Sequence, residues 1–486
     1  MTICHECQGQ GRKRRGISKK VRLRYQRALE EFEKLTSKGE LDVKTPMPPL
    51  DHLDPCLVCD GSGLYFGDDE SSLVLDNENY PHVAIIGGGI GGVALAVACL
   101  HRGIPFTLYE RDSGFDARSQ GYGLTLQQAS KAIEGLGVFT SDMVGGVVST
   151  RHLVHTPDGE VIGEWGIRKW LRSETKAPPK RTNIHIARQS LRLAILDQLG
   201  GHDVVQWGHQ LVDFQENGSG GDGGIDLSFE VDGEVKKAHA DLVVGADGIR
   251  SKVRKSIIGE EISPLRYLGC IVILGICPLE NLSGVESELL DSATVFQTVN
   301  GNDRIYMMPF SEDTVMWQFS FPMQEDEAKA LSAEGVKALK AEACRRTQWH
   351  EPVPQILAAT DESQITGYPV YDRALLEPEM LEKAGPVTLI GDAAHPMSPF
   401  KGQGANQALL DALALARAIT KECRPKSGWK GEGLRKHVLE EFEAEMMKRS
   451  AVKVRDSAEA AKFLHSDVVL HKGDEPRGRC LKRRED

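Results

Sequence analysis

Apolar residues in the middle of the chain follow a pattern that predicts alternating strands and helices. Residues 82–86 (HVAII) form a short apolar run, as a parallel strand buried on both faces requires. A glycine turn, an apolar segment and a second short run ending in YERD at 109–112 follow, and they predict strand, helix and strand. Amphipathic spacing predicts another helix over 187–199. We therefore expect an α/β fold around a parallel sheet.

A second pattern alternates apolar and polar residues and predicts strands with one buried face. The segments are short and separated by turn residues such as Asp158-Gly159, so we expect a mixed β-sheet that forms a substrate domain. They are residues 151–165, 266–277, 292–299, 304–310 and 313–321. Two further strands are predicted around 204–214 and 226–235, with the flexible loop ENGSGGDGG between them, and helices at 325–347, 403–423 and 437–465.

The first eighty residues have a different character. Residues 18–37 place apolar side chains on one face of a predicted helix, and the proline-rich segment 45–50 cannot continue it. A polar stretch over 68–79 then leads to the strand at 82–86. The expected organisation is an N-terminal module over 1–80, a main domain over 81–425, and a C-terminal helix with a polar tail over 426–486. The substrate sheet is interleaved in the main domain at about 150–180 and 262–380.

Composition narrows the functional classes. The chain has 486 residues, of which 40% are apolar and 27% charged, as in globular proteins. A net charge of −11 argues against general attraction to nucleic acid or to an anionic membrane. The longest apolar stretch, residues 93–100, is too short to span a bilayer, and residues 1–30 lack the apolar region of a signal peptide. We expect a cytoplasmic protein without a membrane span.

Three glycines after the first strand carry a dinucleotide-binding pattern. Gly87, Gly89 and Gly92 form G-x-G-x-x-G, in which the first permits a tight turn, the second admits a pyrophosphate and the third allows close helix packing. Phosphate then lies at a helix N-terminus, where free N–H groups and the helix dipole favour negative charge. Glu110, at the end of the next strand, is placed to accept hydrogen bonds from a ribose. The unit predicts a Rossmann-type site for FAD or NAD.

Two later motifs decide between these cofactors. Residues 241–254 (DLVVGADGIRSKVR) and 391–410 (GDAAHPMSPFKGQGANQALL) resemble signatures of the aromatic-ring hydroxylases, the single-component FAD monooxygenases with the p-hydroxybenzoate hydroxylase fold. The resemblance covers about residues 81–425. It is greatest to the branch with salicylate hydroxylases, tetracycline-inactivating monooxygenases and zeaxanthin epoxidases. It implies that NAD(P)H reduces FAD, that O₂ forms a flavin hydroperoxide, and that one oxygen atom hydroxylates or epoxidises an aromatic or polycyclic small molecule.

The same motifs suggest how the flavin is held. Gly391-Asp392 ends a strand, so the carboxylate can meet a ribityl hydroxyl, and the helix beginning near Gly402 can direct its amides at the isoalloxazine ring. In the resembled family, the Asp-Gly motif touches both FAD and the nicotinamide. The candidate cofactor-binding residues are Gly87, Gly89, Gly92, Glu110, Arg111, Arg188, Asp247, Gly391, Asp392, Pro399, Gly402, Gly404 and Asn406.

No side chain is assigned a catalytic role, because flavin oxygenation needs no protein nucleophile. His395 is expected to pack or cap within its loop. Substrate contacts are expected from 307–310, from 316–319 and from Pro399-Phe400, although core packing explains these apolar residues equally well. No second G-x-G-x-x-G follows another strand, so we expect one stored FAD and a visiting NADPH or NADH.

The N-terminal module carries a repeated cysteine pattern. CHECQGQG (4–11) and CLVCDGSG (56–63) both read Cys-x-x-Cys-x-Gly-x-Gly, with 48 residues between the two cysteine pairs. Their four thiolates, from Cys4, Cys7, Cys56 and Cys59, suffice for a structural tetrahedral Zn²⁺ site, and a thiol redox pair or unliganded cysteines are the alternatives. The pattern resembles the repeats of the Hsp40 (DnaJ) cysteine-rich region, which implies metal binding more firmly than chaperone function.

Nine Lys/Arg between Arg12 and Arg27 leave several roles open for this module. It could pack on a small-molecule hydroxylase, mediate homo-oligomer formation, or recruit a protein partner to a flavin oxidase. A flavin-binding regulator without turnover is a further alternative. A plain solvated helix face also explains the basic residues.

Overall fold

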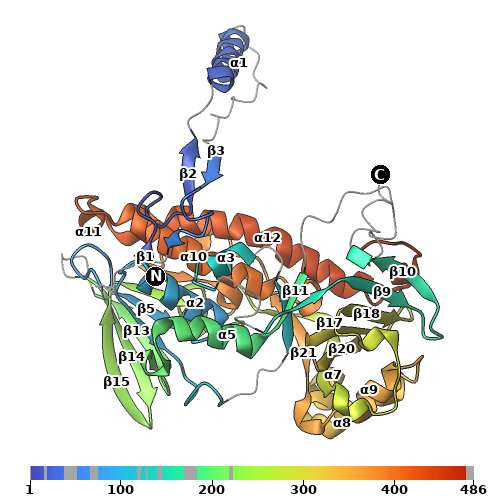
Figure 1. Cartoon of the computed structure of the whole chain (residues 1–486). Helices are drawn as coiled ribbons and strands as arrows, with labels where there is room; N and C mark the ends of the chain where they lie inside the picture. The colour runs from blue at the N-terminus through green and yellow to red at the C-terminus, as the bar shows by residue number, and fades with distance from the viewer. Residues whose placement is uncertain are drawn as a thin grey trace. The chain divides into compact units, whose positions relative to one another are not determined.

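The computed structural model describes residues 2–15, 19–37, 52–65, 75–117, 122–126, 130–138, 145–168, 183–217 and 223–477. They form two compact units, Met1–Ser72 and Leu73–Asp486 (Figure 1).

The core of the larger unit is a five-stranded parallel sheet in the order β12-β6-β5-β16-β22. Its strands are β5 (Val83–Ile86), β6 (Phe106–Tyr109), β12 (Val205–Gln206), β16 (Leu242–Gly245) and β22 (Val387–Leu389). All four residues of β5 are buried, as its apolar run predicts. Helices α2 (Ile90–Leu100), α5 (Arg188–Leu196) and α10 (Gly404–Glu422) pack together beside the sheet. The predicted α/β architecture is confirmed.

A seven-stranded mixed sheet forms the second layer, in the order β10-β9-β18-β19-β20-β17-β21. Only the β9–β18 pair is parallel within it. The strands are β9 (Arg151–His155), β10 (Val161–Trp165), β17 (Leu265–Pro278), β18 (Thr294–Val299), β19 (Arg304–Ser311), β20 (Thr314–Pro322) and β21 (Ile365–Arg373). The mixed sheet predicted from the alternating segments is therefore confirmed.

The two faces of this sheet have different neighbours. Met307, Trp317 and Phe319 belong to a buried cluster with the helices α7 (Glu325–Ala333), α8 (Val336–Arg346) and α9 (Val353–Ala359). Met308 and Met316 belong to a cluster on the other face. The helix predicted over 325–347 is in fact two helices, because Gly335 has a left-handed backbone (φ +89°) that interrupts it.

Two strand predictions are wrong. Residues 204–214 are not a single strand, because they divide between β12 (Val205–Gln206) of the parallel sheet and β13 (Gln210–Glu216) of another sheet. Residues 226–235 are not a single strand, since a turn at Asp232-Gly233 divides them into β14 (Ile225–Val231) and β15 (Glu234–Ala240). Together with β13 (Gln210–Glu216) these strands make a three-stranded sheet. A further small sheet has the order β7-β11-β8, from β7 (Gly123–Leu126), β11 (Asn183–Ala187) and β8 (Val147–Ser149).

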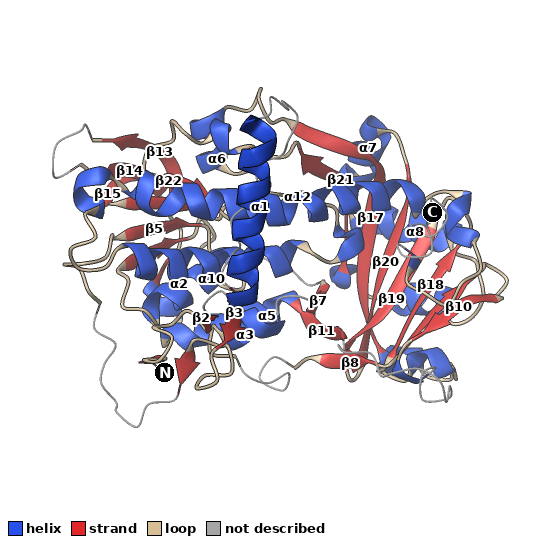
Figure 2. Ribbon diagram, turned by 90° about the horizontal axis from the view of Figure 1, so that it is seen from above, coloured by secondary structure: helices blue, strands red, loops and turns tan. Residues whose placement is uncertain are grey.

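Helix α12 (Glu440–Phe463) runs alongside both layers of the larger unit (Figure 1; Figure 2). Its Arg449 contacts Gln407 and Asp411 of α10, and just beyond its end His465 bonds Ser320 of β20. The short helices α3 (Ser130–Glu134), α6 (Lys252–Ile258) and α11 (Trp429–Glu432) complete the unit. Among the helices of the described ranges, none is both long and apolar enough to cross a membrane.

The described residues of the smaller unit form two short antiparallel ribbons and one helix. Strand β1 (Thr2–Ile3) pairs with β4 (Leu64–Tyr65), and β2 (Arg12–Arg15) pairs with β3 (His52–Pro55). Helix α1 (Lys19–Ser37) lies between β2 and β3 in sequence and confirms the helix predicted over 18–37. The four basic residues Arg12–Arg15 form β2, and the other basic residues of this segment lie on α1. The basic segment is therefore part strand and part helix.

Candidate active site

In the glycine turn after β5, two positions leave no room for a side chain and the third faces open space. Gly87 adopts φ +110°, and a Cβ there would lie 2.6 Å from the Ala246 carbonyl oxygen. A Cβ on Gly92 would lie 1.8 Å from the Gly87 carbonyl oxygen. A Cβ on Gly89 would meet nothing within 4 Å. Gly87 and Gly92 thus shape the turn, whereas Gly89 leaves room for a ligand.

A cavity of about 740 Å³ begins at this turn and extends to the start of α10. It is lined by residues 89–91, by 246 and 248–250 after β16, by 390–392 after β22, and by 402–405. Among the described residues, no side chain caps the N-terminus of α2 or that of α10. Two sets of helix N–H groups are therefore offered to a ligand at this cavity.

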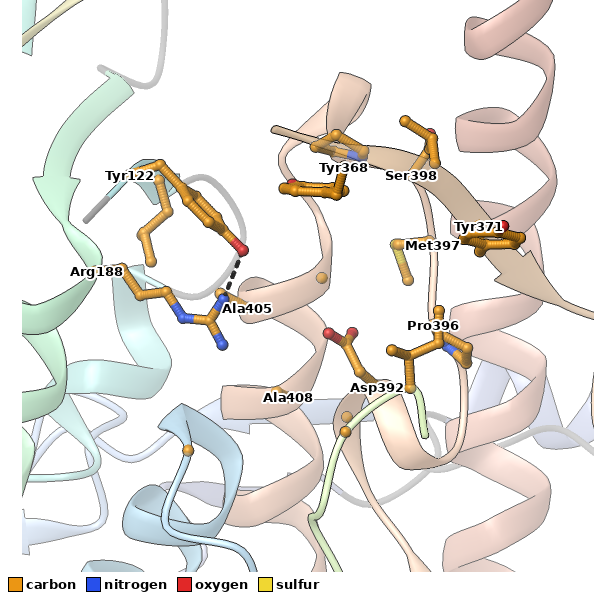
Figure 3. Close-up of a pocket in the computed structure, with 18 of the residues that line it drawn as sticks. Tyr122, Arg188, Tyr368, Tyr371, Asp392, Pro396, Met397, Ser398, Ala405 and Ala408 are labelled. Atoms are coloured by element: carbon orange, nitrogen blue, oxygen red, sulfur yellow. Dashed lines mark hydrogen bonds between the residues drawn. The ribbon is translucent and has the colours of Figure 1, made fainter. Parts of the chain in front are cut away.

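Arg188 and Asp392 extend into the cavity from different elements (Figure 3). Arg188 begins α5 and its Nη1 donates to the Tyr122 hydroxyl at 3.0 Å. Removal from bulk water raises the pKa of Asp392, and the nearby Arg188 guanidinium opposes that rise. Burial likewise raises the pKa of Tyr368 well above its usual value. The cavity wall thus brings the Arg188 guanidinium and the Asp392 carboxyl group together with tyrosine side chains.

The turn that carries Asp392 is held from two sides by buried charges. The Asp411 carboxylate accepts hydrogen bonds from the Gly391 amide at 2.9 Å and from His395 Nε2 at 2.7 Å, and it also pairs with Arg449 at 2.8 Å. Opposite it, Arg254 Nη1 donates to the carbonyl oxygens of residues 393 and 394 at 2.9 and 2.8 Å. His395 therefore positions the turn rather than facing a ligand, as the sequence interpretation expected.

Several candidate cofactor residues make protein contacts instead of lining the cavity. The Asp247 carboxylate accepts hydrogen bonds from Ser251 and from the amides of Lys252 and Val253 at the start of α6. Asn406 Nδ2 donates to the carbonyl oxygens of Thr125 and Gly402, both at 2.9 Å. Both side chains brace loops that border the cavity.

Glu110 supports the glycine turn from behind. Its oxygens accept hydrogen bonds from the Gly88 amide at 2.7 Å and from the Asp112 amide at 3.0 Å. The neighbouring Arg111 is exposed. Of the candidates, those that line the cavity are Gly89, Arg188, Gly391, Asp392, Pro399, Gly402 and Gly404.

A second cavity of about 1060 Å³ adjoins the first. Both are lined by Gly123, Leu124, Gln318, Pro399, Gly402 and Gln403. Its wall includes Met308, Met316, Phe400 and Phe463, with Gln297, Arg304 and Tyr306 on the sheet. Of the segments expected to contact substrate, Met308, Met316, Pro399 and Phe400 line this cavity, whereas Met307 and Phe319 lie on the opposite face of the sheet.

A chain of hydrogen bonds lies behind this second cavity. His185 connects the hydroxyls of Thr125 (3.0 Å) and Ser149 (2.8 Å), and Ser149 in turn contacts His152 at 3.2 Å. Thr125 and His152 line the cavity, and His152 stacks on Trp165. Burial lowers the pKa of His185 to about 3 and that of His152 to about 4, so both rings are neutral at pH 7. A neutral ring offers one donor and one acceptor and can bridge two hydroxyls.

These neutral histidines predict acid sensitivity. The pKa of His185 in the folded protein lies below its ordinary value of 6.5, so the unfolded chain takes up the proton first as the pH falls. The stabilising contribution of a neutral His185 is complete above pH 6.5 and declines below it, by up to about 1.4 kcal/mol per pH unit. Urea unfolding at pH 7.5, 6 and 5 should show a smaller decline for His185→Gln than for wild type. Equal pH slopes for the two proteins would contradict a buried neutral ring.

The geometry of the first cavity fits FAD. Gly89 leaves space beside the N-terminus of α2 for a pyrophosphate, and Asp392 and the start of α10 lie at the other end, where a ribityl chain and a flavin ring would follow. A parallel sheet with this glycine turn, joined to a mixed sheet that walls a second cavity, defines the class of single-component flavoprotein monooxygenases.

Comparison with known proteins identifies the family. Residues 80–437 match the FAD binding domain family, and the chain belongs to it. Aurachin C monooxygenase/isomerase from Stigmatella aurantiaca is 31% identical over 342 residues, which is 70% of this chain and 81% of that protein. The chain is an FAD-dependent monooxygenase.

Two further relatives show the extent of the likeness. Chloroplastic zeaxanthin epoxidase from Nicotiana plumbaginifolia is 28% identical over 70% of this chain, and the chain spans about half of that longer protein (48%). The crystal structure of Klebsiella pneumoniae HpxO complexed with FAD and uric acid shares the fold, with a TM-score of 0.63, 23% identity, and coverage of 85% of this chain and 95% of that one.

The smaller unit brings its four cysteines together. The sulfur atoms of Cys4, Cys7, Cys56 and Cys59 all lie within 4.8 Å of one another, and all four residues are buried. The amides of Gly11 and Gly63 donate to the sulfurs of Cys7 and Cys59 at 3.1 and 3.2 Å. A Cβ on Gly63 would lie 2.5 Å from the Gly9 carbonyl oxygen, which explains the last glycine of the second repeat.

Proposed function

We propose that this monooxygenase uses NADPH or NADH and O₂ to oxygenate an aromatic or polycyclic small molecule held in the second cavity. The observation that carries the proposal is the shared wall of the two cavities, since a substrate in the second would lie directly against a flavin ring in the first. The flat rings of Phe400 and Phe463 and the adaptable thioethers of Met308 and Met316 suit fused rings.

Different residues of the first cavity would hold different parts of FAD. The N-terminus of α2 would bind the pyrophosphate beside Gly89, Asp392 would accept a hydrogen bond from the ribityl chain, and the N-terminus of α10 would lie against the pyrimidine edge of the ring. Bound FAD supplies the redox chemistry, by taking two electrons from the nicotinamide and activating O₂. Glu110 and Arg111 remain candidates for the adenosine end.

The protein groups around the flavin site position reactants and limit water. Arg188, tethered by Tyr122, would place a fixed positive charge beside the bound flavin, which gains negative charge on reduction. Pro399 and Gly402 line both cavities, so they lie at the border between the flavin site and the proposed substrate site. A substrate held there would displace water from the flavin and limit the loss of activated oxygen as peroxide.

Substrate-stimulated oxidation tests the proposal. Purified FAD-loaded protein is mixed with NADPH or NADH and a panel of phenols, fused-ring aromatics and alkenes, and nicotinamide oxidation and peroxide are counted together. At least one compound should accelerate nicotinamide oxidation without an equal release of peroxide. Slow oxidation that yields peroxide with every compound would favour the alternative, a flavin oxidase directed to a protein partner.

We further propose that the four cysteines of the smaller unit bind one structural Zn²⁺. Four sulfurs within 4.8 Å of one another match the ligand number and spacing of a tetrahedral site. The amide donors from Gly11 and Gly63 would stabilise the sulfurs as thiolates, the form that binds metal. The Cys residues come from two chain segments 48 residues apart, so the metal would join both ends of the unit.

A further inference from the structure

Arg304 is a buried cation in the wall of the second cavity. Its exposed fraction is 5%, and its guanidinium lies 5.0 Å from the centre of the Tyr306 ring. Nε donates to Gln297 Oε1 at 2.9 Å. Within the described ranges, Nη1 is buried and has no hydrogen-bond partner. A guanidinium carries five N–H donors in a planar fork, so part of this fork remains unused.

No carboxylate of the described residues forms an ion pair with Arg304. The adjacent Asp303 is paired with Arg346, at 3.2 Å. Burial lowers the pKa of Arg304 to about 10, so the group stays protonated at neutral pH. A buried charge is retained in proteins when it has a partner, and Arg304 is part of the wall of the second cavity.

We infer that the substrate carries an anionic oxygen, a carboxylate or an ionised phenol or enol, which pairs with Arg304. The inference rests on the proposed function and adds to it the chemical class of the substrate. The planar fork of an arginine suits such oxygens, and a pair formed away from bulk water is strongly held.

The sheet register places this anionic group relative to the flavin site. Tyr306 pairs with Gln318, which lines both cavities, and Arg304 lies two residues further along β19. In the other direction Met308 pairs with Met316, and both lie against Gly123, which also lines both cavities. Residues 304 and 308 are roughly 13 Å apart along a strand. The acidic end therefore lies at Arg304, and the rings extend over the two methionines toward the shared wall.

Binding of matched acids and esters tests the inference. The probes are benzoic, 2-naphthoic and anthracene-2-carboxylic acids, their methyl esters, and 2-naphthol, each titrated into FAD-loaded protein at pH 7.5 while the flavin absorbance is followed. At least one acid should bind 10-fold or more tightly than its ester. 2-Naphthol is also titrated above the pKa of its hydroxyl group, and binding only there would assign an ionised phenol rather than a carboxylate as the preferred group.

Variants test whether Arg304 is the residue that causes the preference for acids over esters. Arg304→Gln should abolish the preference for the acid and raise KM for an acidic substrate with little change in kcat, whereas Arg304→Lys should keep part of it. Arg345→Gln is the matched control, because Arg345 is largely exposed on α8 and pairs with Glu342. If Arg304→Gln fails to retain FAD, Arg304→Met, which is similar in volume and uncharged, replaces it.

Two outcomes would overturn the inference. One is that no acid in the series binds more tightly than its ester, and the other is that the uncharged variant keeps the wild-type preference. A neutral aromatic that gives coupled turnover while the acids show no preference would refute the inference and leave the proposed function intact. Absence of coupled turnover with every compound, despite tight binding of an acid, would refute the proposed function instead.

Discussion

Gly89→Val should give a folded protein that is purified without its yellow colour. The backbone at Gly89 (φ −71°, ψ −177°) suits any residue, and a Cβ there meets nothing within 4 Å, so the protein itself accommodates the side chain. The added methyl groups occupy the space through which a pyrophosphate reaches the amides of α2. We expect FAD affinity to fall roughly 100-fold, about 3 kcal/mol, in titrations of the apoprotein.

Two other glycines provide the comparison for this variant. Gly431→Val places the same side chain on α11, where a Cβ also has open space, and should retain FAD. Gly92→Ala should instead destabilise the fold, because its Cβ would collide with the Gly87 carbonyl oxygen. Full flavin occupancy in Gly89→Val would show that the cofactor does not approach this turn.

Cys7→Ser should remove zinc and unfold the smaller unit while the flavin remains bound. The buried side chains of that unit, within its described residues, are the four cysteines, Ser62 and Leu64, so it lacks an apolar core that could replace a metal. Structural zinc contributes roughly 10 kcal/mol or more of apparent binding free energy to such small units. Limited proteolysis should then cleave within residues 1–72 and spare the rest of the chain.

Cys344→Ser is the control for this variant. Cys344 lies on α8, is partly buried and belongs to the other unit, so its replacement should leave the metal content unchanged. Elemental analysis should find about one zinc per chain in wild type and in Cys344→Ser, and much less in Cys7→Ser. Wild-type protein that is free of metal and yet resistant to protease over residues 1–72 would contradict the zinc proposal.

Local features of the fold could be predicted from the sequence because their signals are local. The strand, glycine turn and helix around Gly87 occupy consecutive residues, and the steric need for glycine at two of the three positions is visible in the backbone. The alternating strands of the mixed sheet were likewise predictable. The hairpin at Asp232-Gly233 was missed, although an Asp-Gly pair between two alternating segments is a known turn signal.

The residues that make up the candidate site were harder to predict from the sequence, for physical reasons. Tyr122 lies far in sequence from Arg304 and Gln318, and only the register of the strands and the packing of the sheets brings the three to one pair of cavities. Asp247 and Asn406 are the opposite case, because they were predicted as cofactor-binding residues and do not line the cavity. Short polar side chains often bond to nearby backbone groups, and here both do so rather than line the cavity.

The fate of molecular oxygen shows whether the chain transfers an oxygen atom to its substrate. The FAD-loaded protein is supplied with NADPH or NADH, with ¹⁸O₂ and with the compound that stimulates nicotinamide oxidation most strongly, and the product is analysed by mass spectrometry. We predict one ¹⁸O atom in each product molecule and one equivalent of nicotinamide oxidised per product formed. Stimulated oxidation that leaves the compound unlabelled and converts all the consumed O₂ to peroxide would contradict it.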